Sequence, residues 1–406
     1  MRKVMKAITM TSAVLMSFLM ISIGLASYFT PDSFQVAAGK NLEWNMAAIT
    51  VTNGGDRISL KNQKRSYTAQ LMLCNIVPIK TVNVDVISDT MLIPCGTPFG
   101  IKMFTNGVVV VGVADIQTAE GNVNPADASN LKVGDVITAV NGNTVNTNAQ
   151  IADLVQKGGG KKMKLVVRRD NLIFSTELQP VKSEVDGTFK AGLWVRDSTA
   201  GIGTLTFYNP NTRCFGGLGH GVCDTDTNEL MPLLNGEIVP VTINGITKGQ
   251  KGTPGELRGY FSTDNAMGNL QANLASGVYG TLNHVPTGKA LEVGMKQDVK
   301  NGPAKILTTI DDKGSQYYDI EIEKIDYREN LDSKNMVIHI TDPKLLAATG
   351  GIVQGMSGSP ILQNGKLVGA VTHVFVNDPT RGYGIFAENM LAVSQNTKSY
   401  LNKKAS

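Results

Sequence analysis

The sequence predicts a mainly β protein, from its composition and from its pattern of alternating residues. Of the 406 residues, 43 are glycine and only 6% are aromatic, a mixture typical of short strands and tight turns. Several segments alternate apolar and polar residues with the period of a strand. Apolar residues make up 42% of the chain and charged residues 18%, which favours a folded protein with room for two or three domains.

The N-terminal segment, residues 1–29, is predicted to be an export signal or a membrane anchor. A positive flank, formed by Arg2, Lys3 and Lys6, precedes an uncharged apolar run that is long enough to cross a bilayer. Gly24-Leu25-Ala26 offers only a mediocre cleavage site, so we favour a retained anchor over a removed signal. The rest of the chain is then expected to lie outside the cytoplasm.

Residues 30–95 are predicted to be a lead-in segment that is only partly β. The first half of this segment is mixed and polar, which suits a loosely ordered tether. Its second half becomes strand-like, because Val82, Val84 and Val86 alternate with polar residues.

The segment 96–182 forms a recognisable module. Its centre, 125–142, has the pattern of a short helix, a Gly-Asp turn, a strand and an Asn-Gly hairpin turn, and in this it resembles the middle of a PDZ domain. A second short helix is predicted over 148–156, and an alternating strand over 163–167. The alternative is a small β-rich spacer without a ligand.

PDZ domains bind an extended peptide along a sheet edge and hold its terminal carboxylate with backbone N–H groups. The resemblance implies that Phe99, Gly100 and Ile101 form this carboxylate-binding loop. The family's first glycine is absent, and Pro98 has no N–H to donate. We therefore expect a peptide ligand, but not necessarily a free C-terminus.

The best candidate for a catalytic nucleophile is Ser357, which lies in a glycine-rich loop at 355–360. The strand pattern that follows, with its tight Asn364-Gly365 turn, excludes the G-x-S-x-G elbow, which requires a helix. The glycines let the backbone N–H groups of Gly355 and Ser357 face one point, as an oxyanion hole requires. Ser359 is the rival nucleophile, but it occupies a place where the loop needs a small residue. A plain turn is the structural alternative.

A serine nucleophile needs a histidine base, and the chain has four histidines. His220 lies in a loop of small residues, 216–222, that would give a substrate access to its ring, so we predict that it is the base. His373 follows Ser357 by one hairpin and is a candidate for the substrate pocket, with a structural role as the alternative. His339 falls in an alternating strand and His284 in a turn, and we expect neither to be catalytic.

The acid that would orient the histidine is the hardest residue to assign. Asp342 ends a strand shortly before the serine and could turn towards the imidazole. Asp224 and Asp226 follow His220 very closely, although a loop could fold back. The alternative for Asp342 is an ordinary Asp-Pro turn.

No metal or other cofactor is expected. The chain has four cysteines, too few for a disulfide framework and without the paired CxxC spacing of a zinc site. A bridge between Cys214 and Cys223 remains possible, although free thiols are the simpler interpretation. The net charge of +4 is spread along the chain without a basic block, which argues against nucleic acid as a partner.

Three motifs, together with a PDZ-like segment ahead of a peptidase-like segment at 192–406, resemble the stage IV sporulation protein B family. They are Phe215-Gly216-Gly217-Leu218-Gly219-His220-Gly221, Gln354-Gly355-Met356-Ser357-Gly358-Ser359-Pro360 and Thr372-His373-Val374-Phe375-Val376-Asn377-Asp378-Pro379. The family consists of PDZ-containing serine endopeptidases of endospore formers, distantly similar to chymotrypsin. The resemblance implies a double β-barrel with His220, Asp342 and Ser357 as the triad. The acid is nearer the serine than in chymotrypsin-like enzymes in general.

The resemblance also implies a place in the cell. Members of the family are exported from the forespore, held at the membrane and cut themselves. They act on a membrane regulator in the intermembrane space, which leads to activation of a late sigma factor. Two alternatives remain: a quality-control protease similar to the high-temperature-requirement family, where the PDZ domain follows the peptidase, and a non-catalytic PDZ scaffold. The intact His, Asp and Ser set argues against the scaffold.

Overall fold

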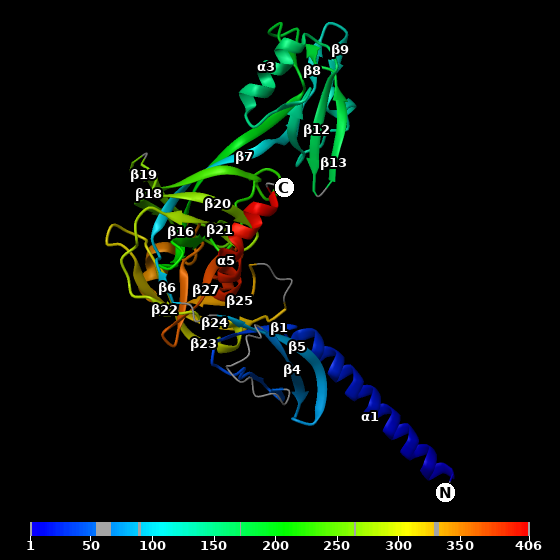
Figure 1. Ribbon diagram of the computed structural model, residues 1–406, viewed down its shortest axis with the longest axis vertical. Helices are drawn as coiled ribbons and strands as arrows, with labels where there is room; N and C mark the ends of the chain where they lie inside the picture. The colour runs from blue at the N-terminus through cyan, green and yellow to red at the C-terminus, as the bar shows by residue number, and fades with distance from the viewer. Residues whose placement is uncertain are drawn as a thin grey trace.

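The computed structural model describes residues 2–53, 66–87, 91–170, 172–263, 265–328 and 333–404. Residues 54–65 and 88–90 of the expected lead-in segment lie outside this description. Figure 1 shows an elongated molecule whose N-terminal helix and the PDZ-like part lie at opposite ends, with the peptidase strands between them. The predicted mainly β class is confirmed.

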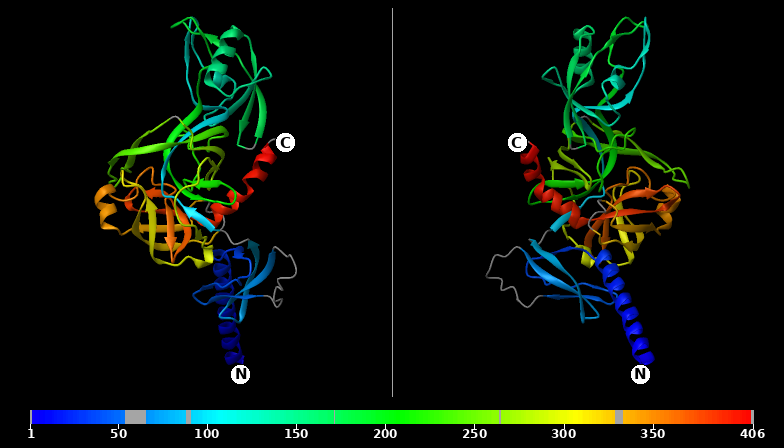
Figure 2. Two further views of the ribbon diagram at one scale, coloured as in Figure 1. Left: turned by 60° about the vertical axis from the view of Figure 1, so that its left-hand side comes forward. Right: turned by 90° about the vertical axis from the view of Figure 1, so that its right-hand side faces the viewer.

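Helix α1 (Arg2–Phe29) begins the chain and projects away from the rest of the molecule (Figure 2). Its segment Ile8–Phe29 is long and apolar enough to cross a membrane and is not buried by the protein. This exposure is consistent with either an anchor or a signal sequence.

A five-stranded sheet follows, in the order β1-β5-β4-β3-β2. Val82 and Val84 are buried in it, as the alternation predicted. This sheet packs against the C-terminal β-barrel that is described below. The contact is made by Trp44, which lies edge-on to Tyr327 with ring centroids 5.6 Å apart. The lead-in is therefore docked, not a loose tether. Its strands are β1 (Ser33–Ala37), β2 (Asn45–Met46), β3 (Ile49–Asn53), β4 (Ser66–Leu73) and β5 (Val77–Ile87).

Two long strands, β7 (Pro98–Val113) and β16 (Leu193–Tyr208), connect the PDZ-like part to the peptidase. They pair with each other along nearly their whole length, from Pro98–Thr204 at one end to Val113–Leu193 at the other. Both belong to a 13-stranded sheet that continues from one part into the other. The domain boundaries expected near residues 96 and 192 therefore do not separate two sheets. The first half of β7 and the second half of β16 belong to the peptidase-like part. The PDZ-like part is inserted between these two half-strands.

The inserted part packs α2 and α3 against its strands, around a core that includes Val108, Ile137, Val155 and Leu165. Helix α3 begins with a capping box, in which Thr147 and Gln150 bond each other's backbone N–H groups. The elements of this part are β8 (Ile116–Thr118), β9 (Gly121–Val123), α2 (Pro125–Ala128), β10 (Val136–Val140), β11 (Asn143–Thr144), α3 (Asn148–Gly158), β12 (Met163–Arg169), β13 (Leu172–Leu178), β14 (Val181–Lys182) and β15 (Phe189–Lys190).

The first peptidase unit surrounds a core built on Phe99, Phe215 and Ile238, each with no exposed surface. In it β7 pairs with β16 on one edge and with β18 on the other. Its remaining strands are β6 (Met91–Pro94), β17 (Cys214–Gly217), β18 (Leu233–Thr247), β19 (Glu256–Phe261), β20 (Gly268–Leu274), β21 (Gly277–Leu282) and β22 (Leu291–Glu292).

The second peptidase unit is a closed barrel in the order β23-β24-β25-β28-β27-β26. Its interior is aliphatic, with Ile306, Ile322, Ile338 and Ile361 fully buried. Its elements, with the helices beside it, are η1 (Lys296–Asp298), β23 (Gly302–Thr308), β24 (Gln316–Ile325), β25 (Met336–Ile340), α4 (Pro343–Thr349), β26 (Pro360–Gln363), β27 (Lys366–Phe375), β28 (Asp378–Phe386) and α5 (Ala387–Lys404).

Candidate active site

Ser357 lies in a loop between α4 and β26, which we call the serine loop (residues 354–360). Gly355 and Gly358 adopt φ angles of +96° and +95°, a conformation that other residues rarely adopt. A larger residue would also not fit at position 358, because its Cβ would lie 2.0 Å from the carbonyl oxygen of Thr204. The two glycines let the loop turn tightly and lie directly on β16.

Two backbone donors of this loop have no acceptor within the described residues. They are the N–H groups of Gly355 and Ser357, whereas the N–H groups of Met356, Gly358 and Ser359 are all hydrogen-bonded inside the protein. Free N–H groups beside a serine hydroxyl are what an oxyanion hole requires.

His220 lies in the neighbouring loop, which we call the histidine loop (residues 216–222). The two loops are in contact: the amide of Leu218 donates to the carbonyl of Thr204 at 3.2 Å, and a Cβ on Gly358 would lie 2.5 Å from the Leu218 nitrogen. Residues far apart in sequence, from the two peptidase units, therefore meet at one place.

Two histidine rings are in contact here, and Ser357 is hydrogen-bonded to the residue before one of them. The His220 and His373 rings lie 4.8 Å apart between centroids and are tilted by 36°. The Ser357 hydroxyl donates to the carbonyl of Thr372, the residue before His373, at 2.7 Å. Ser357 and His220 thus both contact the segment Thr372–His373, but the serine proton is held by a backbone carbonyl and not by an imidazole.

The electrostatics of His220 suit a proton acceptor. Its Nδ1 lies 2.9 Å from the carbonyl oxygen of Gly221, so Nδ1 carries a proton in the neutral ring and Nε2 is left as the basic atom. Burial lowers the pKa of His220, and the Gly221 bond raises it by less. The ring is therefore neutral at pH 7.

His373 is held still more firmly in its neutral form. Burial, then the neighbouring His220, then Lys334 lower its pKa to about 4. Its Nδ1 is buried and has no hydrogen-bond partner among the described residues. A buried polar atom without a partner is energetically costly.

Asp342 has another task in this structure. Its Oδ1 accepts the amides of Lys344 and Leu345 at 2.8 and 3.1 Å, which caps the N-terminus of α4. Its Oδ2 accepts the amide of Asp319 at 3.3 Å. The expected pairing of Asp342 with His220 is not formed, because the carboxylate is committed to a helix cap and the Gly221 carbonyl takes the imidazole Nδ1.

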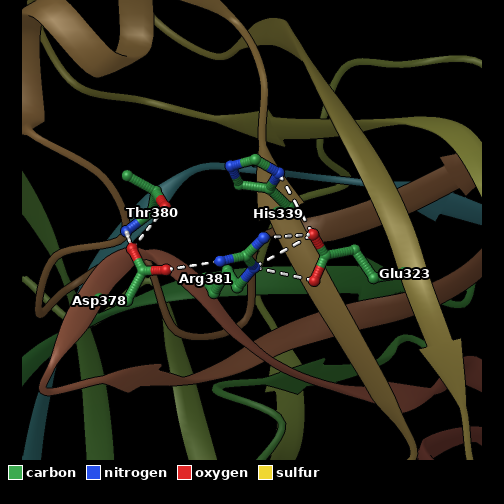
Figure 3. Close-up of polar contacts among 5 residues, drawn as sticks. All are labelled: Glu323, His339, Asp378, Thr380 and Arg381. Atoms are coloured by element: carbon green, nitrogen blue, oxygen red, sulfur yellow. Dashed lines mark hydrogen bonds and ion pairs between the residues drawn. The ribbon is translucent and has the colours of Figure 1, made fainter.

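The remaining acidic and histidine candidates are engaged elsewhere. Asp224 is bound by Arg196, and His284 is exposed. His339 lies 3.4 Å from Glu323, which also holds Arg381 in a two-pronged ion pair on the barrel (Figure 3). This network links β24, β25 and β28, so His339 has the structural role that its strand pattern predicted.

The predicted carboxylate-binding loop of the PDZ domain is wrong. Phe99, Gly100 and Ile101 lie inside β7 and pair with β16 and β18 on its two edges. Phe99 and Ile101 are buried in the core of the first peptidase unit. Their backbone N–H groups have strand partners and cannot form a loop for a carboxylate.

The structure offers a different groove in the inserted part. A cavity of about 480 Å³ lies between α3 and the start of β16. At Leu193–Arg196 one edge of β16 pairs with β7, and the other has no strand partner among the described residues. Apolar side chains line the cavity, among them Ile116, Ile151, Val155, Leu193 and Val195. The sequence signal that could have located this groove was Gly192, directly before an apolar strand. We missed it because it fell at the expected boundary between two domains. In the structure this glycine has a φ angle of +69°.

Within the described residues, no group of three or more His, Cys, Asp and Glu side chains could hold a metal ion. The four cysteines are free thiols, so the considered bridge between Cys214 and Cys223 is not formed.

Comparison with known proteins gives two family matches. The model described as SpoIVB peptidase S55 matches residues 187–391, and a PDZ domain model matches residues 124–169. The first match spans just over half of the chain.

Similar solved structures match only parts of the fold. The PDZ domain of the SdrC-like protein from Listeria monocytogenes has 19% identity and a TM-score of 0.18, covering 22% of this chain and 87% of that one. The HtrA-type protease AlgW with a decapeptide has 10% identity and a TM-score of 0.30, covering 50% and 55% of the two chains. The inactive form of the Rv3671c protease of M. tuberculosis has 13% identity and a TM-score of 0.27, covering 48% and 83%.

The family match spans the histidine loop, the serine loop and the strands that bring them together. The protein is therefore a serine endopeptidase with a PDZ domain, and it belongs to the SpoIVB peptidase S55 family.

Proposed function

We propose that Ser357 is the nucleophile of this endopeptidase and His220 its general base. The observation that carries the proposal is the contact between the serine and histidine loops, with a neutral imidazole and, beside one hydroxyl, two backbone N–H groups that have no acceptor in the described part of the chain. A hydroxyl becomes an effective nucleophile when a base takes its proton and donors hold the oxyanion that forms.

The reaction begins when Ser357 turns its hydroxyl from the Thr372 carbonyl to Nε2 of His220. The oxygen attacks the peptide carbonyl carbon, its proton passes to His220, and the N–H groups of Gly355 and Ser357 hold the oxyanion. His220 then gives the proton to the leaving amine, which leaves an acyl-enzyme. Water, deprotonated by the same ring, hydrolyses the ester and restores Ser357.

The group that orients His220 in this proposal is the Gly221 carbonyl and not Asp342. The 2.9 Å bond to Nδ1 supports this assignment, as does the use of the Asp342 carboxylate at the start of α4. A neutral carbonyl fixes the tautomer of the ring but stabilises the imidazolium less than a carboxylate would.

His373 is proposed to form part of the substrate pocket. Its ring lies against His220, and its buried Nδ1 has no hydrogen-bond partner among the described residues, so a substrate that reached it would satisfy it. An extended peptide is proposed to bind in the groove between α3 and the open edge of β16, as a strand added at Leu193–Val195. The apolar lining selects apolar side chains in that peptide.

We further propose that the enzyme is anchored in a membrane by α1 after export from the forespore, where it cuts itself and then a membrane regulator. This step would trigger late sigma-factor activation during sporulation. Membership of the SpoIVB peptidase family and the exposed apolar helix support this assignment.

The experiment that tests the catalytic proposal uses the full chain in detergent micelles, as wild type, Ser357→Ala and His220→Ala. We expect a fluorophosphonate probe to label the wild type and self-cleavage fragments to accumulate. Both variants should lose labelling and fragments while keeping the wild-type melting temperature. Equal labelling of wild type and Ser357→Ala would refute the nucleophile.

A further inference from the structure

Each carbonyl near the oxyanion hole is held by a hydrogen-bond donor, two of them by donors from outside the serine loop and the third by Ser359. The Gln354 carbonyl accepts the amide of Leu257 at 2.8 Å, and the Gly355 carbonyl accepts the hydroxyl of Thr204 at 2.7 Å. The Met356 carbonyl accepts the amide and the hydroxyl of Ser359, at 2.9 and 2.6 Å. The three consecutive peptide groups of the loop are thus fixed in orientation.

Fixing a carbonyl also fixes the N–H of the next residue, because the peptide group is planar and trans. The bond to the Gln354 carbonyl therefore sets the direction of the Gly355 N–H, and the bonds to the Met356 carbonyl set that of the Ser357 N–H. The Gly355 carbonyl belongs to the peptide group between these two donors. If it rotated, both N–H groups would be displaced.

Thr204 connects this peptide group to the rest of the site. It is buried on β16, its amide donates to the Ser357 carbonyl at 2.9 Å, and its own carbonyl accepts the amide of Leu218 in the histidine loop. Thr204 therefore contacts both loops, and only its hydroxyl acts on the Gly355 carbonyl.

Ser359 acts from the other side of the loop. It has no exposed surface, so the rival nucleophile of the sequence is out of reach of a substrate. Its hydroxyl has two acceptors, the Met356 carbonyl at 2.6 Å and the hydroxyl of Thr308 at 2.9 Å, and the Met356 carbonyl is the nearer of the two.

We propose that Thr204 and Ser359 are positioning residues that hold the oxyanion hole of Ser357 open, because their buried hydroxyls fix the Gly355 and Met356 carbonyls. The inference rests on the proposed function of Ser357. Neither residue touches the substrate. Their effect falls on the transition state, in which the oxyanion exists, more than on substrate binding.

The test compares Thr204→Val with a matched control, Thr206→Val, in the full chain. Thr206 is also buried on β16, and its hydroxyl donates at 2.7 Å to the Gly358 carbonyl, whose peptide group carries no donor of the hole. Both variants replace a buried hydroxyl by a methyl group and leave one carbonyl without its donor. They should lower the melting temperature by similar amounts.

The measurements are the rate of fluorophosphonate labelling, and kcat and KM on unfolded casein. Thr204→Val should slow labelling and lower kcat by roughly 10- to 100-fold with KM changed less than about twofold, the pattern of a lost transition-state interaction. Thr206→Val should stay within about threefold of the wild type, and Thr204→Ser, which restores the hydroxyl, should recover most of the lost rate. Ser359→Ala should behave like Thr204→Val.

Equal slowing by Thr204→Val and Thr206→Val would overturn the inference, because the effect would then follow stability alone. A Thr204→Ser variant as slow as Thr204→Val, or a Ser359→Ala variant with the wild-type rate, would overturn it too. If the wild type is labelled, Ser357→Ala is not, and Thr204→Val matches the wild type, only this inference fails. Labelling that persists in Ser357→Ala refutes the proposed function and this inference with it.

Discussion

At the scale of single residues, the site is defined by which proton each group holds. Ser357 donates to the Thr372 carbonyl, and His220 keeps its Nδ1 proton on Gly221 and presents a neutral Nε2. In the proposed mechanism this is a resting arrangement, and a rotation of the Ser357 side chain would precede catalysis.

The pH dependence follows from the neutral state of His220. Its pKa lies below the ordinary value of 6.5 because burial disfavours the charged ring. The labelling rate should therefore rise with pH through a midpoint below 6.5 and stay level from about pH 7 to 8. A rate profile against pH measures this midpoint, and a midpoint above 7 would contradict the assignment of His220 as a buried base.

His373 should make the protein sensitive to acid. Its folded-state pKa of about 4 lies below the unfolded value of 6.5, so the unfolded chain binds more protons between these values. Stability is complete above pH 6.5 and is lost progressively as the pH falls towards 4. His373→Phe should show a smaller drop in melting temperature between pH 7 and 5 than the wild type. An equal drop in both proteins would exclude His373 as a source of the acid sensitivity.

Substitutions of Asp342 distinguish a helix-capping role of its carboxylate from a catalytic role. Asp342→Ala should cost about 1 kcal/mol of stability by removing the cap of α4, whereas Asp342→Asn should keep most of the cap. Because no bond joins Asp342 to His220 here, Asp342→Asn should be labelled at close to the wild-type rate. Loss of labelling as severe as in His220→Ala, without loss of stability, would instead make Asp342 the catalytic acid.

At the scale of elements, local sequence patterns predicted several helices and strands. They did not predict how strands far apart in the sequence pair. The α3 helix, the strand β10 and the hairpin of β26 and β27 were predictable, since their apolar periods and turn residues are local signals; Asn364 and Gly365 have the positive φ angles of such a turn. The placement of Phe99 was not, because an apolar strand segment looks the same whichever sheet it joins.

In the candidate site, too, some residues could be predicted from local sequence and others could not. Ser357 and His220 stand in glycine-rich loops, which carry a readable signal, whereas Thr204 is one threonine in a long strand. The role proposed for Thr204 rests on a hydrogen bond to a residue 151 positions away, which no local pattern reveals. The capping role of Asp342 did have a local signal, since proline directly after an N-cap residue favours the start of a helix.

The groove along α3 and β16 yields a prediction at this scale. Ala152 is exposed and lines the cavity, so Ala152→Arg should fill the groove without burying a charge in the core. Binding of a pool of fluorescent peptides with apolar C-terminal residues, followed by anisotropy, should fall at least about tenfold. Asp153→Arg, on the neighbouring exposed position outside the lining, is the control and should bind normally. Undiminished binding by Ala152→Arg would place the peptide elsewhere.

At the scale of the whole molecule, β7 and β16 form one continuous ladder between the PDZ domain and the peptidase. β16 begins at the groove, with Leu193, and reaches the serine loop through Thr204. The two parts share a sheet, and the PDZ domain is inserted within the peptidase fold.

Helix α1, at the end of the molecule opposite the PDZ domain, is predicted to hold the protein at a membrane. The full chain should float with phospholipid vesicles in a density gradient, because the apolar segment Ile8–Phe29 of α1 would otherwise face water. The chain without residues 1–29 should remain at the bottom of the gradient. Flotation of the shortened chain would show that another surface carries the attachment.

The most direct measurement of the central claim is the position of the fluorophosphonate adduct in the intact wild-type chain, found by peptide mass spectrometry. The account predicts one adduct, on Ser357, which is lost in His220→Ala. An adduct on Ser359, or on Ser357 at an unchanged rate in His220→Ala, would contradict it.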